Sequence, residues 1–307
     1  MYERINHIMN IAEHFKSGFV AVVGRPNVGK STMINALIGD KIAIVSDKAQ
    51  TTRNRIICVY TDDEKQIVFM DTPGVHKPKH KLGEFMVDAA IESLKETEAV
   101  LFVVAGNEKR GPGDNFIIEQ LKRVRVPVFL VVNKIDTLQK EQVLEAIVSY
   151  QDAYPFAGVI PISAKNKENL SELLNVLGEH LPEGPQYFPE DMITDQPERL
   201  IISDIVREKI LLSTRDEIPH AIAVDVDEMK TRDDGTTYIR ATIYCERDSQ
   251  KGIIIGNKGA LLRKIGAEAR MDIQKLLATK VYLDLWVKVK KDWRNKSGML
   301  SELGYKK

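Results

Sequence analysis

The segment FVAVVGRPNVGKSTMINAL, residues 19–37, joins an apolar, β-branched run to a helical pattern through a glycine-rich loop. It fits G-x-x-x-x-G-K-[ST] in the strand-to-helix context that this pattern requires. Backbone N–H groups of such a loop wrap phosphates, and the helix N-terminus adds its positive dipole end. We therefore predict nucleotide binding by Gly24, Arg25, Pro26, Asn27, Val28, Gly29, Lys30, Ser31 and Thr32.

Two side chains of this loop have specific expected roles. Lys30 is expected to contact the β- and γ-phosphate oxygens, and the Ser31 hydroxyl is expected to bind Mg²⁺.

Apolar runs alternate with helical patterns from residue 18 to about residue 180. Near-continuous apolar strands such as AVLFVVAG and VPVFLVVNK, separated by amphipathic helices, predict a parallel sheet covered on both faces. The expected fold class is α/β, a doubly wound P-loop nucleotide-binding domain.

Three further motifs follow predicted strands, at the sheet edge where open α/β sheets bind ligands. The first is Asp71, Thr72, Pro73 and Gly74, where the acid can hold the Mg²⁺ shell and Gly74 can offer its N–H to the γ-phosphate. The second is Asn133, Lys134 and Asp136, whose carboxylate can accept two hydrogens from the guanine edge. The third is Ser163, Ala164 and Lys165, whose backbone N–H groups can face guanine O6. Together they predict a GTP and GDP site.

The net charge of zero conceals an asymmetry between the two halves of the chain. Residues 251–307 contain 14 basic and 5 acidic residues, a net of +9. Such a segment either meets a polyanion or is a solvated, lysine-rich face. No apolar run approaches the ~20 residues of a membrane span. Cys58 and Cys245 are expected to be buried free thiols of a cytosolic protein.

A proline-rich stretch separates two different patterns. We expect a lead-in helix or extension at 1–16, a nucleotide-binding domain at 17–181, a linker at 182–198 and a second domain at 199–307. The second domain has an α-β-β-α-α-β pattern with the glycine loop GNKG at 256–259, which lacks the [ST] of a P-loop.

The order of elements around GNKG resembles a type II KH domain, an α+β fold whose GXXG loop clamps about four nucleotides of RNA. Gly256 and Gly259 would allow close backbone approach, with Asn257 and Lys258 on the phosphates. Ile253, Ile254 and Ile255 would form an apolar wall for bases. The alternative is a packing element with glycines for geometry. The expected RNA-binding residues are Lys251, Ile254, Gly256, Asn257, Lys258, Gly259, Arg263 and Lys264, with Arg270 extending the basic surface.

The motifs GRPNVGKST, QTTR and DTPGV, followed by a KH pattern and the closing strand DLWVKVK, resemble the Era family of bacterial GTPases over residues 16–307. The resemblance implies binding near the 3′ end of 16S ribosomal RNA and a role in maturing the small ribosomal subunit (30S). We further expect a cytoplasmic monomer, and the net charge of +9 over residues 251–307 makes peripheral association at the inner face of the cell membrane an alternative for its basic part. Thr51 or Thr52 would complete the Mg²⁺ shell, and we favour Thr52.

Val75 occupies the position where Ras-like domains have a water-orienting glutamine. Slow intrinsic hydrolysis is therefore expected, or else Val75 simply packs beneath the loop. Asn27 matches the asparagine that seats a monovalent cation in potassium-activated relatives, so K⁺ is a candidate cofactor; alternatively, Asn27 only stiffens the loop. The expected catalytic residues are Lys30, Thr52, Gly74 and Asn27.

Two other functional classes stay open at this level. One is a nucleotide-gated RNA-binding module with negligible turnover. The other is a membrane-surface GTPase whose basic C-terminal part meets anionic lipid.

Overall fold

The computed structural model describes residues 14–45, 48, 51–75, 78 and 80–305. The expected helix at 1–16 falls almost entirely outside these residues. The described part forms two compact units, and the second one contains Gln196–Lys307. Among the described residues, no helix is both long and apolar enough to cross a bilayer.

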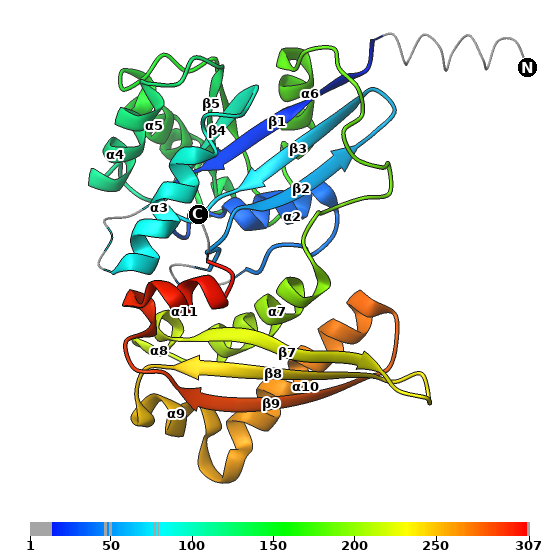
Figure 1. Cartoon of the computed structure of the whole chain (residues 1–307). Coiled ribbons are helices and arrows are strands. Elements are labelled where there is room, and N and C mark those ends of the chain that lie inside the picture. The colour runs from blue at the N-terminus through cyan, green and yellow to red at the C-terminus, as the bar shows by residue number, and fades with distance from the viewer. Residues whose placement is uncertain (1–13, 46–47, 49–50, 76–77, 79, 306–307) are drawn as a thin grey trace, which may run out of the picture. The chain divides into compact units, whose positions relative to one another are not determined.

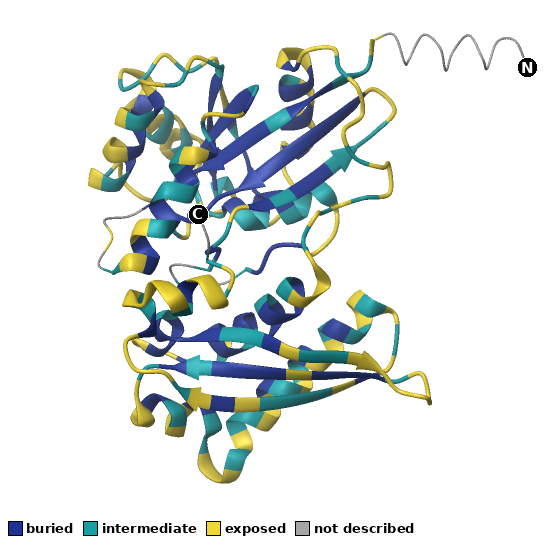
Figure 2. Cartoon of the chain, in the orientation of Figure 1, coloured by how far each residue is buried: buried dark blue, intermediate teal, exposed yellow. Residues whose placement is uncertain are grey.

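The first unit is built on a six-stranded sheet with strand order β2-β3-β1-β4-β5-β6 (Figure 1). The strands are β1 (Lys16–Val23), β2 (Ile56–Thr61), β3 (Lys65–Asp71), β4 (Ala99–Ala105), β5 (Val128–Asn133) and β6 (Gly158–Pro161). Strands β3, β1, β4, β5 and β6 pair in parallel. The near-continuous apolar runs of β3, β4 and β5 are buried on both faces, as the dark strands in Figure 2 show. The predicted fold class is confirmed.

Helices cover both faces of this sheet. The helices are α2 (Lys30–Ile38), α3 (Lys81–Glu92), α4 (Pro112–Leu121), α5 (Lys140–Gln151) and α6 (Leu170–His180). A short 3₁₀ turn, η1 (Ile135–Thr137), follows β5. Side chains of α2 and α6 pack in one core, whereas those of α3, α4 and α5 pack in the core on the opposite face.

The sequence predicts a parallel sheet, whereas the edge strand β2, which contains Cys58, is antiparallel. It pairs antiparallel to β3 because only a short turn joins the two strands, too short for a parallel crossover. The expected linker is also more ordered than its prolines suggest. The backbone N–H of Val59 donates to the carbonyl of Ile193 at 2.9 Å. The segment therefore lies along the exposed edge of β2 and is part of the first unit as far as Asp195.

The second unit has a three-stranded sheet of order β7-β8-β9, with β7 antiparallel and β9 parallel to β8. The strands are β7 (Ala223–Thr231), β8 (Thr237–Cys245) and β9 (Val281–Val289). The helical elements are α7 (Glu198–Ser213), α8 (Ile218–Ala221), α9 (Asp248–Ile255), η2 (Asn257–Gly259), α10 (Ala260–Leu277), η3 (Trp293–Asn295) and α11 (Ser297–Glu302). This order confirms the predicted α-β-β-α-α-β arrangement.

The second core lies between one face of this sheet and helices α7, α9 and α10. Ile202 and Ile273 from the helices pack with Ile239 and Ile243 of β8, and all four are fully buried. Cys58 and Cys245 are free and buried, as expected.

Candidate functional site

The glycine loop between β1 and α2 requires its glycines for two reasons. Gly29 has a φ of 98°, and a Cβ there would lie 2.2 Å from Nδ2 of Asn133. A Cβ on Gly24 would lie 2.3 Å from the carbonyl oxygen of Val103. Asn27 also has a positive φ, 65°, a conformation that asparagine tolerates better than most residues. The loop is therefore packed closely against β4 and β5, as a phosphate-binding loop must be.

Lys30 lies inside this loop with only 6% of its surface exposed. Its Nζ donates hydrogen bonds to the carbonyl oxygens of Gly24 at 3.1 Å and Arg25 at 3.2 Å. Burial lowers the pKa of Lys30 from 10.5 to about 8, although the nearby Asp71 carboxylate opposes this shift. The side chain is thus held in the loop's interior, where phosphate oxygens would relieve the cost of burying its charge.

The three residues expected to hold Mg²⁺ converge at one point. The Ser31 hydroxyl donates to Oδ2 of Asp71 at 2.7 Å and lies 2.9 Å from the Thr52 hydroxyl. Thr52 also donates to Oδ2 of Asp71 at 3.3 Å. The Thr51 hydroxyl instead donates to the Lys48 carbonyl at 2.7 Å, so only Thr52 joins the cluster.

This cluster fits a magnesium ion chemically. Asp71 is fully buried, and burial raises its pKa despite the opposing effects of Lys30 and the two hydroxyls. Its second oxygen, Oδ1, is buried without a hydrogen-bond partner among the described residues. A cation would satisfy this orphaned oxygen. The described residues contain no group of three or more His, Cys, Asp or Glu side chains that could hold a metal. One carboxylate and two hydroxyls form an all-oxygen donor set, which suits Mg²⁺ that is also bound by substrate phosphates.

Asn133 links three of the predicted motifs. Its Nδ2 donates to the carbonyl of Val28 at 2.9 Å, and its Oδ1 accepts the backbone N–H of Ala164 at 3.0 Å. The side chain is almost completely buried. Asn133 therefore fixes the glycine loop and the two base-recognition loops relative to one another.

The expected guanine acceptor is held by its neighbour. The Ser163 hydroxyl donates to Oδ1 of Asp136 at 2.7 Å, which orients a carboxylate that is otherwise exposed. Lys134 has a φ of 69°, and Lys165 is exposed beside this pair. One Asp136 oxygen is thus anchored within the protein, and the carboxylate keeps acceptor capacity for a ligand.

The Asp71–Gly74 segment touches the glycine loop directly. A Cβ on Gly74 would lie 2.7 Å from the backbone of Pro26, so only glycine fits there. Thr72 donates to the carbonyl of Val22 at 2.7 Å, which fixes the segment to β1. Val75 is 4% exposed, packs in the core and donates its N–H to the Gly24 carbonyl at 3.1 Å. Val28 and Pro73 are likewise buried, and Thr32 is half-buried on α2.

Two residues that contact the glycine loop, Asp114 and Glu108, were not predicted from the sequence. The side chain of Arg25 turns to Asp114 and Glu108, with 2.9 Å to each, so only its backbone is directed to the loop. Glu108 also lies 3.7 Å from Nζ of Lys134. In the sequence, Gly111–Asp114 can be recognised only as the start of a helix. Nothing in that pattern indicates that Asp114 pairs with a residue of the glycine loop.

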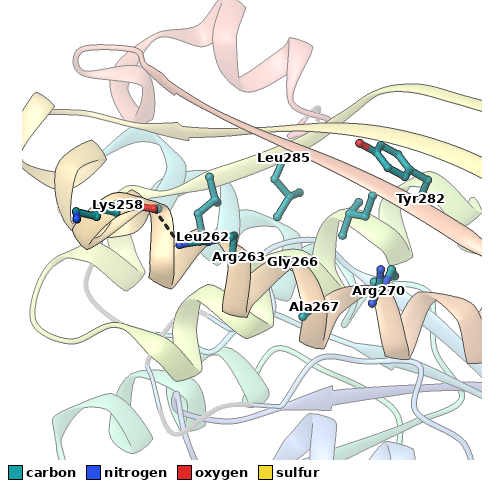
Figure 3. A pocket seen from close by; sticks show the side chains of 10 residues that line it. Lys258, Leu262, Arg263, Gly266, Ala267, Arg270, Tyr282 and Leu285 are labelled. Carbon is teal, nitrogen blue, oxygen red and sulfur yellow. Dashed lines mark hydrogen bonds between the residues drawn. The ribbon is translucent and has the colours of Figure 1, made fainter.

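The GNKG loop forms the short turn η2 between α9 and α10. Gly256 and Gly259 have φ angles of 72° and 77°, and a Cβ on Gly256 would lie 2.8 Å from Leu261 Cβ. Asn257 and Lys258 are exposed at the tip. Arg263 Nη2 donates to the Lys258 carbonyl at 3.1 Å, which stiffens the loop from the first turn of α10 (Figure 3).

A groove runs from this loop along α10 and β9 (Figure 3). Its volume is about 510 Å³. Leucine side chains form its apolar wall, Gly266 and Ala267 leave room on the helix side, and basic residues flank it. The lining residues are Lys258, Gly259, Leu262, Arg263, Gly266, Ala267, Arg270, Tyr282, Leu283 and Leu285. An apolar cleft with a cationic border suits unstacked bases with their phosphates outside.

The structure differs from the expectation for the three isoleucines. Ile254 is fully buried in the core, and Ile253 is 53% exposed. Consecutive residues of a helix point about 100° apart, so they cannot share one wall. The apolar wall comes instead from Leu262, Leu283 and Leu285. Lys251 is half-buried and Lys264 exposed, and neither lines the groove.

Comparisons with known proteins agree with these two sites. A family model described as 50S ribosome-binding GTPase matches residues 19–134, and a KH domain model matches residues 217–294. A crystal structure of Era in complex with MgGDPNP and nucleotides 1506–1542 of 16S ribosomal RNA superposes with a TM-score of 0.93. The sequences are 43% identical, and the match covers 95% of this chain and 99% of that one.

A variant of Era from Aquifex aeolicus bound to GDP and AlF₄⁻ gives a TM-score of 0.92 at 43% identity, with the same coverage of both chains. The shared order of domains and this identity over nearly the whole length show that the chain belongs to the Era family of GTPases.

Proposed function

We propose that this chain is a GTP-hydrolysing switch that binds 16S ribosomal RNA near its 3′ end and assists small-subunit assembly. The observation that carries the GTPase assignment is the convergence of Ser31, Thr52 and Asp71 beside Lys30. The relative solved with MgGDPNP and 16S RNA supports both ligands.

Different residues of the chain would bind the phosphates, the Mg²⁺ ion and the guanine base during hydrolysis. Lys30 would donate to the β- and γ-phosphate oxygens, and the backbone N–H groups of the glycine loop would hold them in place. Ser31, Thr52 and Asp71 would hold Mg²⁺, which supplies charge neutralisation between the β- and γ-phosphates when bound. Asp136, oriented by Ser163, would select guanine. The buried Val75 offers no polar group to a water molecule, which supports slow intrinsic turnover.

A separation-of-function experiment tests the proposal. Changing Asn257→Asp and Lys258→Asp together places negative charge against the RNA backbone, and should weaken RNA binding at least about tenfold and reduce its salt dependence. GTP binding should stay normal. Lys30→Ala should weaken GTP binding and leave RNA binding normal. Lys290→Asp with Lys291→Asp is the control, because these two exposed lysines of the same domain lie outside the groove. Unchanged RNA affinity in a normally folded GNKG variant would overturn the RNA assignment.

A cytoplasmic monomer is the state we propose, with peripheral association at the inner face of the cell membrane as a second activity. The net charge of +9 over residues 251–307 supports an anionic surface as ligand. Vesicles containing anionic lipid, with 16S RNA as competitor, test this: co-flotation that survives excess RNA supports a lipid site separate from the groove, and no flotation contradicts it. Sedimentation equilibrium tests the monomer.

A further inference from the structure

Beyond the groove, aromatic and basic side chains gather on the opposite face of the second sheet. Side chains alternate between the faces of a strand. Ile239 and Ile243 of β8 face the helices, so Tyr238 and Arg240 face away from them. On β9, Tyr282, Asp284 and Trp286 share that outward face. We call Arg232, Tyr238, Tyr282, Asp284 and Trp286 the outer-face cluster.

Ring stacking, cation–π contacts and hydrogen bonds hold the side chains of the outer-face cluster in place. The Tyr238 and Tyr282 rings stack with their centroids 5.9 Å apart and 16° between planes. The Arg232 guanidinium lies 4.9 Å from each ring centroid. Oδ2 of Asp284 accepts hydrogen bonds from Tyr238 Oη at 3.1 Å and from Trp286 Nε1 at 3.0 Å. One carboxylate therefore orients two of the three aromatic side chains.

Large parts of these rings face solvent. Tyr282 is 53% and Trp286 is 54% exposed, and Figure 2 shows exposed positions along β9. Asp284 and Glu228 pair with Arg240, so their charges are offset. Among the described residues, Arg232 forms no ion pair with a carboxylate. The charge of Asp234, two residues further along the chain, interacts with that of Arg232 without forming a close ion pair. The cluster thus offers two aromatic surfaces and a guanidinium group whose N–H donors are not taken up by a carboxylate.

Tyr282 belongs both to this cluster and to the groove wall. It lies opposite Arg270 at the end of the groove away from the GNKG loop (Figure 3). From Ala260 to Arg270 the helix rises about 15 Å at 1.5 Å per residue. The roughly four nucleotides that a KH loop clamps would occupy the groove over this length, and the next nucleotide would meet the edge of β9 at Tyr282.

We propose that single-stranded RNA leaving the groove continues around Tyr282 onto the outer-face cluster, where unpaired bases stack on Tyr282 and Trp286 and Arg232 contacts a phosphate. This inference rests on the proposed RNA binding by the groove. Aromatic side chains with an adjacent arginine bind single strands without demanding a particular base. The face would therefore add affinity for the flanking nucleotides without reading their sequence.

The test compares RNAs of two lengths on the full-length protein. One RNA is a four-nucleotide segment from the 3′ end of 16S ribosomal RNA that fills only the groove, and two longer RNAs extend it by four unpaired nucleotides at the 5′ or the 3′ end. Arg232→Ala and Trp286→Leu remove cluster side chains that do not line the groove. Arg215→Ala, an exposed arginine of the same domain, is the matched control.

We expect each cluster variant to bind the four-nucleotide RNA like the parent and to bind one extended RNA about tenfold more weakly. For Arg232→Ala the log–log salt slope on that RNA should fall by about 0.7, the value for one phosphate contact on a single strand. Arg215→Ala should leave all three affinities unchanged. Parental affinity of both cluster variants for both extended RNAs would overturn the inference and favour a protein partner for this face.

An equal loss on short and extended RNAs would also overturn it, because the side chains would then act on the groove or the fold. The Asn257→Asp, Lys258→Asp variant distinguishes RNA binding by the groove from additional RNA binding by the outer-face cluster. If it binds every RNA normally, the proposed function fails; if it loses them all while the cluster variants behave like the parent, only the outer-face inference fails.

Discussion

Nε of Arg25 donates a hydrogen bond to Oδ1 of Asp114, a carboxylate with no exposure to solvent, at 2.9 Å. Oδ2 of the same carboxylate accepts the backbone N–H of Gly111 at 2.8 Å. Nη2 of Arg25 also reaches Glu108, which in turn lies near Lys134. The glycine loop is thus connected by charged side chains to the start of α4 and to the base-recognition loop.

Replacing Glu108 with glutamine should loosen this connection without damaging the fold. The side chain of Glu108 is 41% exposed, so solvent screening limits the expected stability loss to less than about 1 kcal/mol. If the two loops restrain bound nucleotide together, a loss of about 0.5–1 kcal/mol would speed GDP dissociation roughly two- to fivefold. Stopped-flow release of a fluorescent GDP measures this. Glu119→Gln, which breaks an exposed pair with Lys122 in the same domain, is the control; equal rates in both variants would contradict the prediction.

Guanine selection should depend on the anchored carboxylate of Asp136. Asp136→Asn replaces the acceptor of the guanine donors with an amide, which should reduce GTP affinity by at least ~100-fold, within the reach of discrimination by buried hydrogen bonds. Affinity for xanthosine triphosphate should rise, because its base edge complements the amide. Titrations with both nucleotides measure the switch. Ser163→Ala should weaken GTP binding more mildly without improving the xanthosine nucleotide, and unchanged GTP affinity in Asp136→Asn would refute the assignment.

Potassium should stimulate hydrolysis more than sodium. The buried, apolar Val75 adds nothing to Lys30 in stabilising the charge that develops on the phosphates, and Asn27 of the glycine loop is the candidate to seat an additional cation. Asn27→Gly is the informative variant, because glycine tolerates the φ of 65° whereas alanine would add backbone strain. Phosphate release should show a potassium response in the parent and a reduced one in the variant. Equal rates in the two salts would eliminate this role.

Local chemistry was easier to predict from the sequence than the partners of individual side chains. The spacing of glycine, lysine and carboxylate residues was enough to predict the phosphate loop and the ligands around Asp71. Each of these motifs depends on a few residues that are close together in the sequence. The run around Cys58 is strand-like in sequence, but its antiparallel place at the edge of the sheet depends on the short turn to β3 and not on its own apolar pattern. The buried Ile254 shows that helical phase, rather than composition, decides which residue of a run reaches a groove. The Arg25–Asp114 pair joins residues far apart in sequence, so no local pattern could indicate it.

The last prediction concerns the proton on Lys30. Its pKa is about 8 in the folded protein and 10.5 as the reference value for the unfolded chain, because burial disfavours the charge. Between these values the unfolded chain binds more protons than the folded one, so the free energy of unfolding should rise with pH. The penalty is fully present below about pH 8 and is relieved progressively up to about pH 10.5, by ~3 kcal/mol at most.

Comparison with Lys30→Met isolates this effect from other groups that titrate in the same range, since methionine has similar length and no charge. Denaturant unfolding of the nucleotide-free proteins should show the parent gaining stability relative to the variant from pH 8 to 10.5. Phosphates should restore the normal pKa of Lys30, so GDP binding near pH 8 should take up about half a proton, which calorimetry in buffers of different ionisation enthalpy measures. A parent–variant difference that stays constant over this range, together with no proton uptake, would show that Lys30 keeps its charge in the empty loop. The neighbouring Asp71 carboxylate would then outweigh burial, which reverses the order of the two effects on which the prediction rests.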